Sequence, residues 1–305
     1  MRPAPALLLI LSMMFASGVA SAQSAPTPDK HTALMGARFD STHFAVYTAS
    51  ANADYAAKLE SDLERYFSAF QKEFWDFIRI ENRESHIDLL VFDSQEAFDT
   101  FAGGDVNAPP GEKGYSSKTA NRIACVRQDA YYKDVMIIVH EMAHVFNRFC
   151  LDETPVWLDE GLAQYYSNYA GYQCGNPLTV SGVDVPSLRA IDEALRAGTF
   201  VKTIELVRLS DDAFYSEFSG LHYAEAWALV YYLRRGTGDD GDERLASCYG
   251  LLTRGRTSAE AFTTTYGLDY DSFEHGWLEY LSRLFDEFAA SQERVSTDAE
   301  TETKR

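Results

Sequence analysis

The sequence predicts an α+β protein, in which a small N-terminal mixed β-sheet subdomain with helices is followed by a mainly helical C-terminal subdomain. Short segments rich in β-branched and aromatic residues, bounded by turn residues, precede residue 130. From residue 131 onward, apolar residues recur with helical spacing. The chain has 305 residues, of which 46 % are hydrophobic, so both parts can contribute to a full core.

The first 22 residues have the pattern of a secretory signal peptide. Arg2 supplies the basic start, residues 6–15 form an apolar run, and small residues end at Ala22. The run is too short to span a bilayer, and no later segment is long enough. We therefore expect an exported protein, periplasmic or secreted, that is cleaved after Ala22 and has no integral membrane association. Residues 23–40 are expected to be a flexible lead.

The chain is strongly acidic. Its formal charge is −19, and cleavage removes one arginine and no acid, which leaves −20. Such a charge gives no electrostatic reason to bind nucleic acid or an anionic membrane surface. It would attract cationic peptides, although a role in solubility explains the charge equally well.

Residues 41–130 are predicted to form the N-terminal α+β subdomain. Its expected elements are a strand at 43–48, a long helix at 52–77, a strand at 87–92, a short helix at 94–101, and a hairpin of Tyr115 with 122–126. A loop at 103–114, with four glycines and two prolines, precedes the hairpin.

The next helix carries the motif His140-Glu141-Met142-Ala143-His144. Positions four apart share a helix face, so the two histidines can bind one metal ion, and Glu141 can reach a water on that ion. Apolar neighbours indicate that the helix is buried, and buried histidines need a reason. The alternative is a pair of core histidines that bond backbone carbonyls.

A second helix follows after the turn at 150–153. Thr154 is a plausible N-cap, and Pro155 suits the first helical position. A carboxylate near the start of this helix can supply a third ligand and leave a fourth position for water. Asp159 and Glu160 both qualify, because spacing alone cannot separate neighbours on a helix.

The two helices resemble the gluzincin metallopeptidases, in particular the peptidase MA-like group. The match is carried by His-Glu-x-x-His and by a Trp-Leu-x-Glu-Gly-x-Ala segment at 157–163, and the likeness extends loosely over 42–284. It implies a zincin-like fold, Zn²⁺ held by His140, His144 and Glu160, and Glu141 as general base. Gluzincins often have an acidic residue four after the ligand glutamate, where this chain has Gln164, whose oxygen can still accept an imidazole N–H without adding charge.

The resemblance implies two further features. The hairpin before the metal helix would pair with the substrate backbone, although an ordinary structural hairpin fits the residues as well. Tyr223 would donate a hydrogen bond to the oxyanion, although it could equally be a core tyrosine. His222 is a weaker candidate for the same role or for a substitute ligand, and the remaining histidines fall in no ligand pattern.

Residues 131–288 are predicted to form the helical subdomain with the metal site, and residues 289–305 a disordered charged tail. Beyond the second motif helix we expect a loop at 169–185 and further helices at 186–197, 202–209, 220–233, 243–253, 258–265 and 270–288. The apolar stripe of the last helix is assigned to the core.

An even number of cysteines in an exported protein suggests disulfides. Cys125, Cys150, Cys174 and Cys248 allow three pairings, and Cys150 and Cys174 bracket the second motif helix, which makes a clasp there attractive but unproven. Free buried thiols are the alternative.

These observations favour an exported zinc peptidase that hydrolyses peptide bonds through a zinc-activated water, acting on a peptide or protein substrate. The alternatives are a non-catalytic, zinc-stabilised envelope binding protein with a vestigial site, and a scaffold that uses its helical part to contact partners. The sequence leaves the oligomeric state and the cleavage specificity open.

Overall fold

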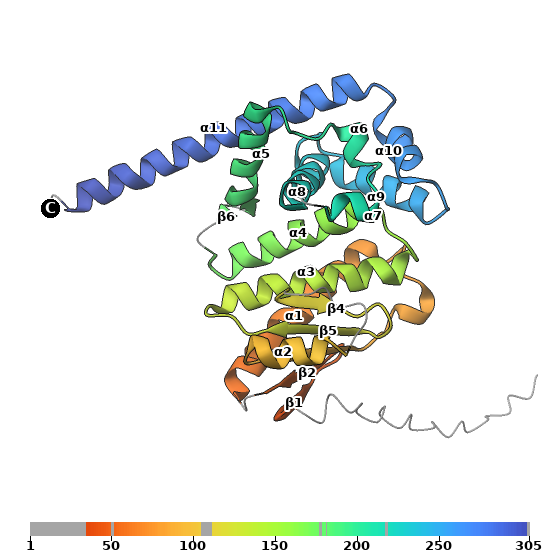
Figure 1. Ribbon diagram of the computed structural model, residues 1–305, viewed down its shortest axis with the longest axis vertical. Coiled ribbons are helices and arrows are strands. Elements are labelled where there is room, and N and C mark those ends of the chain that lie inside the picture. The colour runs from red at the N-terminus through yellow and green to blue at the C-terminus, as the bar shows by residue number, and fades with distance from the viewer. Residues whose placement is uncertain are drawn as a thin grey trace, which may run out of the picture.

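The computed structural model describes residues 35–49, 52–104, 112–176, 179–180, 182–216 and 219–303. The predicted signal peptide, most of the predicted lead and most of the loop at 103–114 lie outside these residues. Within them the fold is the predicted α+β, zincin-like arrangement, with a small mixed sheet first and helices through most of the remainder (Figure 1).

The sheet has the strand order β1-β2-β3-β5-β4. The three central strands are parallel, and each edge strand is antiparallel to its neighbour. The strands are β1 (Ala37–Asp40), β2 (Phe44–Thr48), β3 (Ile87–Phe92), β4 (Gly114–Ser116) and β5 (Arg122–Val126). Because β4 is an edge strand, one side of its backbone is not paired within the sheet.

Helices cover both faces of the sheet. On one face, Val46 and Leu89 belong to a core shared with α1 (Ala53–Phe74) and α3 (Tyr131–Cys150). On the other, Tyr47 and Leu90 pack with Phe98 of α2 (Gln95–Ala102). All five residues of β2 are therefore buried, since a parallel central strand has no solvent face.

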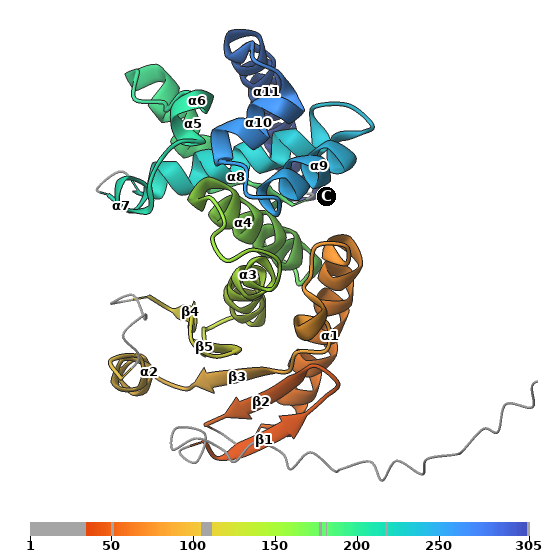
Figure 2. The ribbon, with the colours of Figure 1, turned by 90° about the vertical axis from the view of Figure 1, so that its right-hand side faces the viewer.

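The C-terminal part is built on three stacked helices, with α4 (Val156–Gln173) between α3 and α8 (Ser219–Arg235) (Figure 2). Gly161 of α4 makes the α4–α8 contact possible, because a Cβ at this position would lie 2.6 Å from the carbonyl oxygen of Ala226. The remaining elements are η2 (Ile80–Asn82), β6 (Thr179–Val180), β7 (Val183–Asp184), α5 (Val185–Ala197), α6 (Thr203–Leu206), α7 (Asp211–Phe214), α9 (Gly241–Leu252), α10 (Ser258–Tyr266) and α11 (Tyr270–Thr303).

Several elements differ from the sequence-based expectation. Strand β1 falls within the predicted lead, where its four residues gain order by pairing with β2. The short hairpin of β6 and β7 lies in the predicted loop at 169–185. Helix α4 begins at Val156 with Pro155 as its N-cap, one residue later than predicted. Helix α11 continues to Thr303 through most of the predicted tail, which contains no proline or glycine to end it.

The predicted disulfides are not present, because all four cysteines are free thiols. Cys150 ends α3 and Cys174 follows the end of α4. The two helices run antiparallel, so these cysteines lie at opposite ends of the pair rather than beside each other (Figure 1). Among the described residues, no helix combines the length and the hydrophobicity that a membrane crossing requires.

Candidate metal centre

The two motif histidines lie on one face of α3, as their spacing predicted. The Nε2 atoms of His140 and His144 are 3.1 Å apart. The ring of His144 is buried, whereas that of His140 is partly exposed. The two imidazoles therefore point their nitrogens at one position at the edge of the core.

Glu160 of α4 completes the cluster. Its Oε2 lies 3.4 Å from Nε2 of His140 and 3.6 Å from Nε2 of His144. This oxygen is buried and accepts no normal hydrogen bond from the described residues. Two imidazole nitrogens and a carboxylate oxygen, all within 4.8 Å of one another, form a donor set that fits a divalent metal ion such as Zn²⁺.

The structure separates the two carboxylates that the sequence left as alternatives. Asp159 does not join the cluster, since its Oδ2 lies 2.9 Å from Nδ1 of His144, on the opposite side of the ring. Successive residues on a helix point about 100° apart, so neighbouring carboxylates reach different nitrogens of one imidazole. Glu160 Oε2 therefore lies with the two Nε2 atoms, whereas Asp159 contacts the other nitrogen of His144.

The surroundings of Glu160 favour its charged form. Burial alone would raise its pKa, but His144, His140 and a hydrogen bond from Tyr215 lower it to about 2. The pKa of His144 responds to the same charges. Burial would lower it, but Asp159 and Glu160 raise it to about 10. Without a metal the cluster therefore attracts a proton, and a metal ion would replace the positive charge of that proton.

Tyr215 is a residue of the site that the sequence analysis missed. Its hydroxyl donates a 2.6 Å hydrogen bond to Oε1 of Glu160, which leaves Oε2 facing the histidines. Tyr215 lies just after the short helix α7, 55 residues from Glu160, and its side chain is 49 % exposed. Neither a motif nor a periodic pattern marks such a position.

Tyr223, the oxyanion donor implied by the resemblance, lies near Tyr215 and Glu160. Its ring centre is 6.2 Å from that of Tyr215. Burial, followed by the charge of Glu160, raises the pKa of Tyr223 above its ordinary value, with a smaller effect from Glu141. Tyr223 is therefore a protonated phenol beside the cluster at neutral pH.

Glu141 and His222 are placed differently. Glu141 directly follows His140 and is partly buried, and its charge contributes to raising the pKa of both His144 and Tyr223. His222 lies outside the cluster, and its Nδ1 contacts the backbone carbonyl of Phe214 at 2.8 Å. Gln164 makes no hydrogen bond to His140 or His144 among the contacts of the described residues.

Edge strand β4 runs beside α3, which carries the two motif histidines (Figure 2). A Cβ on Gly114 would lie 2.5 Å from Cγ2 of Ile137, so only glycine lets the strand approach α3 this closely. Arg148, one turn beyond His144, fixes the end of the strand by donating to Oγ of Ser116 and to the carbonyl of Ser117, both at 3.2 Å.

Comparison with known proteins agrees with this geometry. No curated protein matches the sequence. The sequence profile of the Peptidase MA superfamily matches residues 111–283, which include β4, both motif helices and most of the helical part. The match covers more than half of the chain and confirms the predicted gluzincin-like family over this region. The chain belongs to the peptidase MA superfamily.

Proposed function

We propose that this protein is an exported zinc-dependent peptidase, in which His140, His144 and Glu160 hold the metal. The observation that carries the proposal is the convergence of two Nε2 atoms and Oε2 of Glu160 beside Glu141, in a chain of the peptidase MA superfamily. Three protein ligands leave the fourth position of a tetrahedral site for water or substrate, as in catalytic rather than structural zinc sites.

Glu141 is the proposed general base. A zinc ion in this site would polarise the scissile carbonyl and acidify the attacking water. Glu141 follows His140 directly, so its carboxylate can accept the proton that the water loses on attack. It then returns this proton to the amine nitrogen as the C–N bond breaks.

The two tyrosines have separate proposed roles. Tyr223 keeps its proton at neutral pH and can donate a hydrogen bond to the oxyanion that develops on the carbonyl oxygen. Tyr215 already donates to Glu160, so it holds the carboxylate in the orientation that directs Oε2 to the metal.

The substrate class follows from the edge strand. The outer edge of β4 can pair with an extended peptide, and backbone hydrogen bonds make few demands on the substrate sequence. Arg148 and Gly114 hold this strand against α3, which carries the histidines and Glu141. A peptide added to β4 would therefore be held beside the catalytic glutamate.

The proposed export rests on the N-terminal sequence pattern alone. If it is correct, the mature protein from the periplasm or the medium begins at Gln23. An intact N-terminus in the cytosolic fraction alone would contradict export and leave the peptidase proposal standing.

Cleavage of a mixed peptide library by the zinc-loaded mature protein tests the activity, with Glu141→Gln as the matched control. We expect the wild type to cleave and the variant to lose about 1,000-fold or more of the activity while keeping its zinc. Equal cleavage by both proteins would indicate a contaminant. Zinc binding without cleavage by either protein would favour the non-catalytic, zinc-stabilised alternative.

A further inference from the structure

A series of contacting side chains, beginning with the partly exposed Asp159 and continuing to two deeply buried residues, leads away from the candidate metal cluster on the far side of His144. It begins at Asp159, whose Oδ2 lies 2.9 Å from Nδ1 of His144. The other carboxylate oxygen, Oδ1, accepts a hydrogen bond from Nδ2 of Asn147. Oδ1 of Asn147 in turn accepts a 3.1 Å hydrogen bond from the hydroxyl of Tyr249. These contacts therefore link Tyr249 of α9 to Asn147 of α3, Asn147 to Asp159 of α4, and Asp159 back to His144 of α3.

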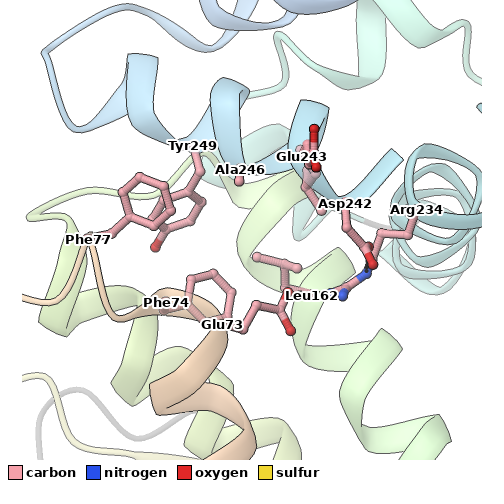
Figure 3. A pocket seen from close by; sticks show the side chains of 10 residues that line it. Glu73, Phe74, Phe77, Leu162, Arg234, Asp242, Glu243, Ala246 and Tyr249 are labelled. Carbon is pink, nitrogen blue, oxygen red and sulfur yellow. Dashed lines mark hydrogen bonds and ion pairs between the residues drawn. The ribbon is translucent and has the colours of Figure 1, made fainter. Parts of the chain in front are cut away.

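The two outer members of this series are among the most buried polar residues of the protein. Asn147 is 3 % exposed and Tyr249 is 1 % exposed. The Tyr249 ring packs against Phe74 and Phe77 of the α1 region, with ring centres 5.4 and 5.2 Å away. Tyr249 also lines a pocket of about 320 Å³, and its hydroxyl points away from Asp242 and Glu243 of that pocket (Figure 3). Packing thus fixes the position from which the hydroxyl donates.

The direction of each hydrogen bond follows from the chemistry of the groups. The Asn147 amide has one acceptor end and one donor end, and the Tyr249 hydroxyl donates to the acceptor end. The amide NH₂ group is thereby turned toward Asp159. With Oδ1 of Asp159 engaged, Oδ2 faces Nδ1 of His144, and an Nδ1–H donated to it leaves the Nε2 lone pair free for a metal ion.

We propose that Asn147 and Tyr249 are positioning residues for the metal-binding histidine and act through Asp159. This inference rests on the metal site of the proposed function. It makes α9, which carries no ligand, part of the metal centre. It also assigns a role to two residues that lie outside both motifs and do not touch the metal position.

A swap of the two neighbouring side chains tests the series directly. In Asn147→Asp, two carboxylates face each other, and the donor to Asp159 is lost. In the double variant Asn147→Asp/Asp159→Asn, the new amide at 159 can accept from His144 and donate to the carboxylate at 147. Tyr249 can then donate to that carboxylate. The double variant therefore restores the order of donors and acceptors with the two residues exchanged.

The measurement is Zn²⁺ affinity by competition with a chromophoric chelator, alongside the melting temperature of each metal-free protein. We expect Asn147→Asp to lower the affinity about 10- to 100-fold, and the double variant to recover most of that loss. Tyr249→Phe should lower the affinity several-fold. Tyr266→Phe is its matched control, because the hydroxyl of Tyr266 is buried and has no hydrogen-bond partner among the described residues.

Three results would overturn the inference. One is a double variant that binds zinc no better than Asn147→Asp, and another is Tyr249→Phe behaving like Tyr266→Phe. The third is a wild-type protein that binds no zinc, which would overturn the metal site as well. Because no peptide is present, these outcomes do not depend on cleavage. A protein that binds zinc through this series of contacts but cleaves nothing would contradict only the proposed peptidase activity.

Discussion

Two buried glutamates lie beside the contact between α4 and α8, and their surroundings differ. Glu160 directly precedes Gly161 of α4, and Glu225 directly precedes Ala226 of α8, and the backbones of Gly161 and Ala226 approach each other closely. The two glutamates are 3 % and 0 % exposed. Burial raises the pKa of any carboxyl group, so both residues begin with the same cost. The groups that surround each carboxylate inside the protein therefore decide its charge.

The carboxylate of Glu160 meets two imidazoles and a phenol, which lower its pKa to about 2. Glu225 meets one backbone N–H, from Val201, and the charge of Glu274, and burial raises its pKa to about 8. Glu160 is therefore held as an anion whose Oε2 accepts no normal hydrogen bond from the described residues. Glu225 is held neutral in the packed core. The converging nitrogens, rather than burial, therefore distinguish the proposed metal-binding carboxylate from a structural one.

The largest expected effect is that of Glu160→Gln. Removing the charged ligand should lower zinc affinity by at least about 100-fold. Even the loss of a residue that only hydrogen-bonds a metal ligand lowers metal affinity by about 10- to 100-fold. Chelator competition measures the change, and Glu225→Gln serves as the buried control, with unchanged affinity. If Glu160→Gln kept the wild-type affinity, the third ligand would have to be another residue, with Asp159 and His222 as the candidates.

Glu225→Gln should affect stability rather than metal binding. The folded pKa of about 8 lies above the unfolded value of 4.5, so the native state holds the proton more tightly between these pH values. Glu225 therefore lowers the free energy of unfolding as the pH rises from about 4.5 to about 8. Urea unfolding at pH 9 should find Glu225→Gln more stable than the wild type by roughly 1–3 kcal/mol, with a smaller difference at pH 5. A difference that does not change with pH would contradict the neutral state of Glu225.

The smallest expected effect is that of Tyr215→Phe. This change removes the hydrogen bond to Oε1 of Glu160 but leaves all three ligands in place. We expect zinc affinity to fall by about 3- to 10-fold, because the exposed phenol can be partly replaced by water. Calorimetric titration of the metal-free protein with Zn²⁺ resolves such a change. A loss as large as that of Glu160→Gln would mean that Tyr215 does more than orient the carboxylate.

The parts of the site that follow a local rule could be predicted from the sequence. The i, i+4 spacing placed His140 and His144 on one face, and the family resemblance assigned the ligand role to Glu160. The spacing itself could not choose between Asp159 and Glu160, because that choice depends on the rotation of α4 against α3. Gly161 sets part of this packing through its contact with α8.

The remaining parts depend on distant contacts. Tyr215 and Tyr249 reach the site from short or late helices, and no periodic pattern links them to the motifs. A weak signal existed for Asn147, a polar residue three positions after His144 on a largely apolar helix. In the same way, β1 was missed because a four-residue strand is stabilised by its partner more than by its own sequence.

X-ray absorption spectroscopy of the zinc-loaded protein reports the atoms bound to the metal and therefore tests whether His140, His144 and Glu160 are its ligands. We predict two imidazole nitrogens at about 2.0–2.1 Å, with oxygen ligands completing the shell and no sulfur. The spectrum should be unchanged in Glu225→Gln and should lose its ordered shell in Glu160→Gln. A sulfur ligand from one of the four free cysteines, or a spectrum unaffected by Glu160→Gln, would contradict the metal centre of His140, His144 and Glu160.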